Sequence, residues 1–139
     1  MIDLDNQTQF NIDLEKLELI SNTLTKKDIE LMVVKNDAIQ ELNKEYRNIN
    51  KATDVLSFPM EDPFEHMPLG SIVISTDFVE EKSKEFGHSF DEEFTLLYIH
   101  GLLHLLGFDH EIDNGEHRTK EEELIKEFNL PDSLIVRNS

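Results

Sequence analysis

The chain has 139 residues, a length that predicts one domain over residues 1–139 with a core of its own. Its formal net charge of −17 argues against a general nucleic-acid-binding surface, although a bound divalent ion can still dominate the field inside a cleft. The absence of cysteine excludes disulfides and thiolate metal ligands, and the absence of a signal-peptide pattern or a long apolar run predicts a cytoplasmic protein with no membrane span.

Hydrophobic periodicity predicts four strands and five helices, interleaved early in the chain and mainly helical later. The predicted strands are residues 2–4, 28–35, 53–58 and 71–75. The predicted helices are residues 13–24, 37–46, 77–87, 89–107 and 114–128. Polar residues that can cap these helices stand at their starts, namely Asp13, Asn36 or Asp37, Asp77, Ser89, and Asp113 or Asn114.

Some of these segments carry more specific signals. Asp77 and Ser89 each precede a glutamate at the spacing of a capping box. Residues 28–35 are apolar on both faces in their second half, which predicts an inner strand covered on both sides. The loop at 61–69 holds two prolines and is expected to be exposed and mobile. The elements together predict an α+β fold, with a small mixed, mostly parallel four-stranded sheet packed with helices.

Three of the six histidines fall within the segment HGLLHLLGFDH, residues 100–110. On a helix, the rings of His100 and His104 project from one face about 5–6 Å apart, which suits two ligands of one ion. Gly107 can end that helix because glycine accepts the left-handed conformation, and the reversed chain can return His110 as a third ligand. Three protein ligands leave a fourth zinc position for water. The segment therefore predicts a hydrolase with a zincin-like metal helix.

The same pattern, His-x-x-x-His-x-x-Gly-x-x-His, resembles the metzincin metalloproteases. In a metzincin, as in other zinc hydrolases, a zinc-type ion would lower the pKa of a bound water to about 7. In metzincins a glutamate directly after the first histidine acts as general base, but here that position is Gly101. Loss of a general base often costs about 10²–10⁴-fold in rate. A metzincin-like peptide or amide hydrolase is therefore the second interpretation.

The chain resembles the bacterial YbeY family over roughly residues 28–128, in the histidine segment, in Tyr46-Arg47 and in segments 53–59 and 69–75. The resemblance implies a zinc-dependent, single-strand-specific endoribonuclease. It implies roles in maturing the 3′ end of 16S ribosomal RNA and in ribosome quality control. The implied partners are single-stranded or ribosomal RNA and the ribosome or a ribosomal protein.

The zinc ligands of the family fall on His100, His104 and His110, and its functionally important arginine falls on Arg47. A guanidinium matches the geometry of phosphate oxygens and could stabilise charge that develops on phosphorus. Other first-row divalent ions also suit imidazole ligands, so the residues leave the identity of the metal open. A third interpretation is a ribosome-associated binding module whose zinc is structural.

The family pattern is not followed everywhere. Ser71 stands where many members have aspartate, which puts an acid–base role of that strand position in doubt. Asp109 could orient a ligand imidazole or could be a solvated turn residue. We expect surface positions for His66 and His117 and no functional role for His88. The sequence leaves the general base and the oligomeric state open.

Overall fold

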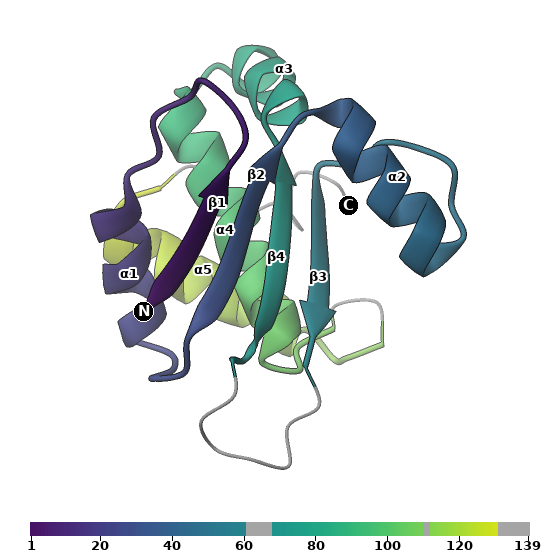
Figure 1. Cartoon of the computed structure of the whole chain (residues 1–139). Helices are drawn as coiled ribbons and strands as arrows, with labels where there is room; N and C mark the ends of the chain where they lie inside the picture. Colours follow the sequence, from purple (N-terminus) through teal and green to yellow (C-terminus); the bar gives the residue numbers. More distant parts are fainter. Residues whose placement is uncertain (61–67, 110–111, 131–139) are drawn as a thin grey trace.

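The structure, a computed structural model, describes residues 1–60, 68–109 and 112–130 (Figure 1). Its strands are β1 (Ile2–Asn6), β2 (Ile29–Val34), β3 (Val55–Pro59) and β4 (Gly70–Ser75). Its helices are α1 (Leu14–Asn22), α2 (Asn36–Arg47), α3 (Thr76–Phe86), α4 (Phe90–Leu105) and α5 (Glu116–Phe128). Among the residues described, no helix combines the length and the apolar character that a membrane span requires.

The strands form one sheet in the order β1-β2-β4-β3. β1 pairs with β2 and β2 with β4 in parallel, whereas β3 pairs with β4 in the antiparallel sense. This confirms the predicted mixed, mostly parallel four-stranded sheet. It also makes β3 an edge strand, which is important for the position of the candidate site.

Helices cover the two faces of the sheet unequally. Figure 1 shows α1, α4 and α5 behind the sheet and α2 on the other side, beside β3. Leu31 and Val33 on β2 belong to the core shared with α4, while Val34 packs with Ile39 of α2. β2 therefore carries apolar side chains on both faces, as the sequence predicted for an inner strand.

Helix α4 is the most buried helix, and both of its ends match the sequence. At its start, Ser89 Oγ accepts from the backbone N–H of Glu92, and the Glu92 carboxylate accepts from the backbone N–H of Ser89, each at 3.0 Å. This is the predicted capping box. The two hydrogen bonds fix the register at which α4 enters the core.

The other end of α4 is a Schellman motif built around Gly107. The backbone N–H of Gly107 donates to the carbonyl of His104, and that of Phe108 donates to the carbonyl of Leu103, each at 3.0 Å. Gly107 has φ +98°, a conformation that favours glycine. Phe108 packs against the cluster that contains Leu103, which is the apolar contact that usually accompanies this motif.

The predicted caps of α2 and α3 are wrong in detail. The N-cap residues are Lys35 and Ser75, and neither makes a side-chain capping bond. The carboxylate of Asp77 instead accepts from the backbone N–H of Asn36 at 2.9 Å, and Ser75 Oγ donates to the side-chain oxygen of Asn36 at 2.8 Å. These polar groups hold the starts of α2 and α3 together, because the parallel β2 and β4 end side by side.

Tyr98 ties α4 to α1 deep in the core. Its side chain is fully buried, and its hydroxyl lies 2.6 Å from Ser21 Oγ. Ser21 Oγ lies 2.9 Å from the carbonyl of Leu17, to which it can donate. Burial raises the pKa of Tyr98 to about 12, because the core disfavours a phenolate.

We therefore expect Tyr98 to make the fold sensitive to alkali. Its contribution to stability is complete below its unfolded pKa near 10 and is lost as the pH rises through about 12. Between pH 8 and pH 11 the loss is roughly 1–1.5 kcal/mol. Urea unfolding at both pH values measures the decrease in the free energy of unfolding from pH 8 to pH 11. This decrease should be smaller in Tyr98→Phe than in wild type by that amount. Equal decreases in the two proteins would contradict this role.

Candidate metal centre

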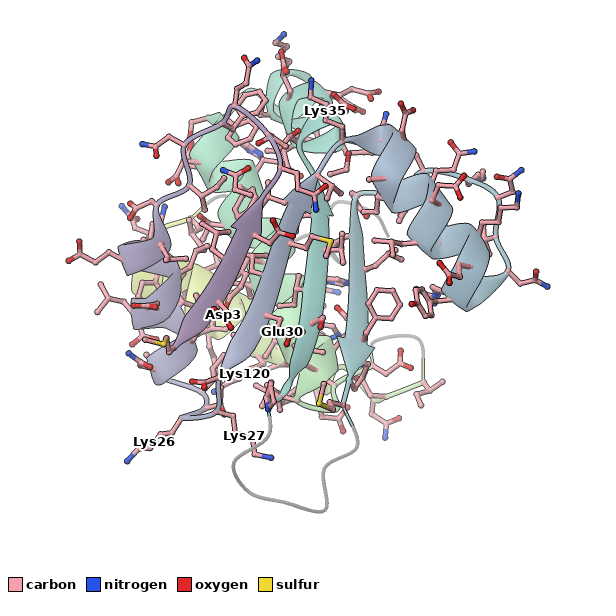
Figure 2. All side chains as sticks on the ribbon, in the orientation of Figure 1. Asp3, Lys26, Lys27, Glu30, Lys35 and Lys120 are labelled. Carbon is pink, nitrogen blue, oxygen red and sulfur yellow. The ribbon has the colours of Figure 1, made fainter. Side chains whose placement is uncertain are left out.

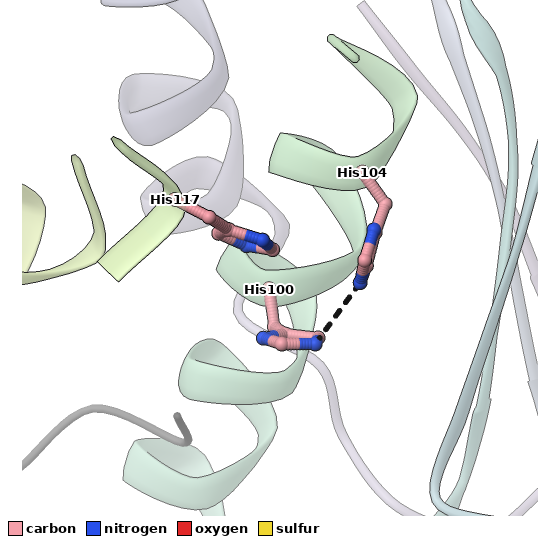
Figure 3. A group of neighbouring side chains, drawn as sticks. All are labelled: His100, His104 and His117. Atoms are coloured by element: carbon pink, nitrogen blue, oxygen red, sulfur yellow. Dashed lines mark hydrogen bonds between the residues drawn. The ribbon is translucent and has the colours of Figure 1, made fainter. Parts of the chain in front are cut away.

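His100 and His104 occupy successive turns of α4 and face each other (Figure 3). Their Nε2 atoms are 3.2 Å apart, and their ring centroids are 4.8 Å apart. Two nitrogens bound to one tetrahedral ion at about 2.0–2.1 Å would be separated by roughly 3.3 Å. His100 is buried and His104 is half-buried, so the pair lies where the core meets solvent. The two side chains therefore fit a shared metal ion.

His117 of α5 joins this pair, contrary to its predicted surface position. The side chain is 0% exposed, and its ring centroid lies 4.8 Å from those of both His100 and His104. The three histidines offer nitrogen atoms that all lie within 4.8 Å of one another. Figure 3 shows that the third ring reaches the pair from a different helix. The prediction of a surface histidine was wrong because it ignored where α5 docks.

The buried carboxylate of Glu121 contacts two histidines of this cluster. One oxygen, Oε2, lies 2.7 Å from His100 Nδ1 and 3.0 Å from His117 Nε2. Burial by itself would raise the pKa of Glu121, but the hydrogen bonds and the electrostatic interaction with the two imidazoles outweigh it and hold the pKa at about 2. The carboxylate is therefore ionised at neutral pH.

The sequence did contain a signal for this arrangement. His117, Glu121 and Leu124 have the spacing of one helix face, and all three are buried. The start of α5 is held by Asp113, whose carboxylate accepts from the backbone N–H groups of Gly115 and His117 at 2.8 and 2.9 Å. The N-cap residue of α5 is nevertheless Gly115, so the predicted cap at Asp113 or Asn114 is wrong in detail. The spacing of α5 indicates an inward-facing His117 rather than the predicted surface residue.

Gly101 lets α4 approach the sheet closely. A Cβ at this position would lie 3.1 Å from both Ile72 Cγ2 and Ser57 Oγ, and Ser57 Oγ donates to the Gly101 carbonyl at 3.1 Å. The position that carries the general base in metzincins is therefore occupied here by the helix–sheet contact. A carboxylate side chain there would have to displace Ile72 and Ser57 at this contact. This observation argues against the peptide-hydrolase interpretation.

The other predicted site residues are not part of the described cluster. Arg47 is the exposed last residue of α2, which packs on the opposite face of the sheet from α4. His110 and His66 lie outside the described residues, as does most of the loop at 61–69. The ligand role of His110 remains a prediction. Asp109 is half-buried, and its orienting role also remains a prediction.

Ser71 lies on the sheet face away from α4, where its hydroxyl donates to the Glu30 carboxylate at 2.8 Å. Its neighbour Ile72 points the opposite way, into the core shared with α4. Asp3 is opposite Glu30 in the register of β1 and β2, and Figure 2 shows both acidic side chains over the front of the sheet. This face would repel phosphate. Ser71 is accordingly not positioned to act on a group held by the histidines.

His88 has a structural partner outside the cluster. Its Nε2 lies 2.7 Å from Oε1 of Glu93, and the side chains are 9% and 0% exposed. The pair lies at the start of α4, whereas His100 and His104 lie in its last turns. This position agrees with the expectation that His88 takes no part in the site.

The chain is similar to known proteins over almost its whole length. A family model described as "Endoribonuclease YbeY" matches residues 3–129. Proteins named Endoribonuclease YbeY from Aliarcobacter butzleri and from a Sulfurovum species are 78% and 57% identical to the chain. These alignments cover 100% of the chain and 100% of the first relative, and 99% of the chain and 97% of the second.

A solved structure agrees with these relatives. The solution structure of TM1509 from Thermotoga maritima is 29% identical to the chain, with a TM-score of 0.61. The match covers 93% of this chain and 92% of the other. The α+β fold is thus shared with a solved structure. The sequence similarity to the named relatives extends over almost the whole chain. The chain belongs to the YbeY family.

Proposed function

We propose that this protein is a metal-dependent, single-strand-specific endoribonuclease, built as one hydrolase domain over residues 1–139. Its relatives over the full length carry the name endoribonuclease, which is the basis for the RNA substrate. The observation that carries the chemistry is the 3.2 Å separation of the Nε2 atoms of His100 and His104. Zinc is the proposed ion, although the donor set suits other first-row divalent metals.

In this proposal His100 and His104 supply two ligands, and His110 supplies the third, as in the family pattern. When bound, such an ion polarises a phosphoryl oxygen and makes an attacking water acidic enough to react near neutral pH. The chain itself orients the imidazoles of His100 and His104, because both project from the buried helix α4. Imidazole nitrogens without cysteine are typical of a catalytic rather than a closed structural site.

Arg47 is proposed to hold phosphate on the far side of the edge strand. Phe58 of β3 packs edge-on against Tyr46, with ring centroids 5.5 Å apart, next to Arg47 at the end of α2. On the other face of β3, Ser57 contacts Gly101 of the histidine helix. An RNA strand that passes around the edge of β3 could therefore meet both the guanidinium and the histidines. Tyr46 is 64% exposed and offers an aromatic face to a base.

The proposed setting is the cytoplasm, in maturation of the 3′ end of 16S ribosomal RNA and in ribosome quality control. The acidic sheet face leaves little surface for non-specific phosphate binding. Recognition of the correct RNA would then depend on the ribosome or a ribosomal protein as a partner. This part of the proposal rests on the family, whereas the metal site rests on the geometry of α4.

Digestion of matched substrates tests the proposed substrate class. Single-stranded RNA labelled at one end should be cut internally, while the same RNA in a duplex and a casein preparation should remain intact. A chelator should stop the cleavage. Zinc-dependent peptide products without RNA products would instead support the peptide-hydrolase interpretation and refute the nuclease proposal.

The Arg47→Ala variant should cleave single-stranded RNA about 10–100-fold more slowly. A charge-assisted hydrogen bond to phosphate is worth about 1.5–3 kcal/mol, and tenfold in rate corresponds to about 1.4 kcal/mol. Initial rates at limiting RNA measure the effect. Lys44→Ala is the matched control, because it removes one positive charge from the last turn of the same helix and should have a smaller effect. Equal losses in the two variants would indicate general electrostatic attraction rather than a phosphate contact of Arg47.

A further inference from the structure

Glu121 of α5 contacts two of the clustered histidines through a single oxygen atom. Its Oε2 lies 2.7 Å from His100 Nδ1 and 3.0 Å from His117 Nε2, and its side chain is 1% exposed. A carboxylate oxygen accepts hydrogen bonds, and its 2.7 Å contact with His100 Nδ1 is one, so that ring nitrogen carries the hydrogen. The contact therefore constrains the protonation of His100.

For His100 this constraint has a direct consequence. A neutral imidazole with hydrogen on Nδ1 has its lone pair on Nε2, and a metal ligand needs that lone pair. Nε2 is the atom that faces His104 at 3.2 Å. The carboxylate thus selects the tautomer and the ring orientation that suit metal binding, as partners of ligand histidines commonly do.

The place of Glu121 is fixed by packing rather than by the histidines alone. One turn further along α5, Leu124 packs with Ile99 and Leu103 of α4. Ile99 and Leu103 each precede one of the two facing histidines in the chain. The docking of α5 on α4 therefore carries the carboxylate to His100.

We propose that Glu121 is the positioning residue of the metal centre. In this arrangement His117 contacts Glu121 and holds it in place, and it does not serve as a metal ligand. The proposal rests on the proposed function, because it presumes that His100 and His104 bind a metal. The ring of His117 lies nearly parallel to that of His100, with an interplanar angle of 26°, and its Nε2 lies 3.0 Å from Glu121 Oε2. The buried negative charge also offsets part of the charge of the ion.

Zinc affinity measured by competition with a chromophoric chelator tests the role of the carboxylate. Glu121→Gln keeps the shape of the side chain and should bind zinc about 10–100-fold more weakly than wild type. Glu122→Gln is the matched control, because it removes the same charge from the neighbouring, exposed position and should bind within about twofold of wild type. Wild-type affinity in Glu121→Gln would overturn the proposal.

Nitrogen NMR of the metal-free wild type gives a second test that does not depend on any variant folding. His100 should show hydrogen on Nδ1 and a bare Nε2, and only the Nε2 resonance should shift strongly when zinc is added. A His100 ring with hydrogen on Nε2 would overturn the positioning role, whatever the zinc affinities are.

His117→Gln separates a supporting residue from a ligand. If His117 is a supporting residue, His117→Gln should lose less zinc affinity than His104→Ala does. Equal losses would make His117 a ligand and overturn that part of the proposal. If wild type fails to bind zinc at all, the proposed function fails as well, whereas normal binding by Glu121→Gln refutes the positioning role alone.

Discussion

Replacing His104 with alanine should abolish zinc binding at micromolar metal and lower RNA cleavage by at least about a thousandfold. His104 supplies one of the two Nε2 atoms that are 3.2 Å apart, and its loss leaves only two of the three proposed ligands to hold the ion. Loss of the ion removes several kcal/mol of charge stabilisation at phosphorus, and each 1.4 kcal/mol is worth about tenfold in rate. Metal content after dialysis and the initial cleavage rate measure the two effects.

The matched control for His104→Ala is His88→Gln. It removes an imidazole at the opposite end of α4 and keeps a hydrogen-bond donor for Glu93, so zinc binding and cleavage should stay near wild type. A residual cleavage rate in His104→Ala close to that of the control would point to a contaminating nuclease.

The same variant distinguishes a catalytic from a structural zinc. A ribosome-associated binding module with a structural zinc predicts that His104→Ala melts at a much lower temperature. In a catalytic site, the half-buried His104 can be removed with little effect on the melting of the metal-free fold. A large loss of thermal stability when zinc is removed from wild type, reproduced in His104→Ala, would favour the binding module.

Introducing the base that metzincins use should unfold this protein rather than create a protease. In Gly101→Glu, the new Cβ would lie 3.1 Å from Ile72 Cγ2 and Ser57 Oγ, and the carboxylate would be buried between α4 and β3. Overpacking costs about 1–3 kcal/mol, and an unpaired buried charge adds several more. We expect a loss of about 4 kcal/mol or more in the free energy of unfolding, measured with urea.

Gly101→Ala provides the graded comparison. Its methyl group meets the same two neighbours, but alanine gains about 1 kcal/mol in helix propensity over glycine. The net change should therefore be small beside that of Gly101→Glu. If Gly101→Glu unfolds within about 1 kcal/mol of wild type, the close approach of α4 to the sheet does not exist as described.

The predictable parts of the fold are those with local signals. The capping box at Ser89 and the left-handed Gly107 lie next to the helix that they delimit, so their geometry follows from the sequence. The inner strand was also predictable, because residues 28–35 repeat apolar side chains on both faces. The histidine pair followed from helical spacing alone, since both residues lie on α4.

The parts that could not be predicted depend on contacts between distant segments. Asp77 has the spacing of a capping residue, yet its carboxylate binds the backbone of Asn36 because β2 and β4 end together. The spacing of His117 and Glu121 indicates one inward helix face, but their contact with His100 depends on how α5 docks on α4, which no local pattern specifies. The proposed role of Arg47 came from the family resemblance. An exposed arginine at a helix end carries no distinguishing signal of its own.

Restoration of cleavage by added metal is the most direct test of the central claim. Protein stripped with a chelator and dialysed would receive graded amounts of zinc, and cleavage of end-labelled single-stranded RNA would be followed at each step. If the histidines of α4 hold a catalytic ion, the stripped protein should be inactive, and cleavage should return in proportion to bound zinc and saturate near one ion per chain. Full activity in the stripped protein would contradict a metal-dependent nuclease.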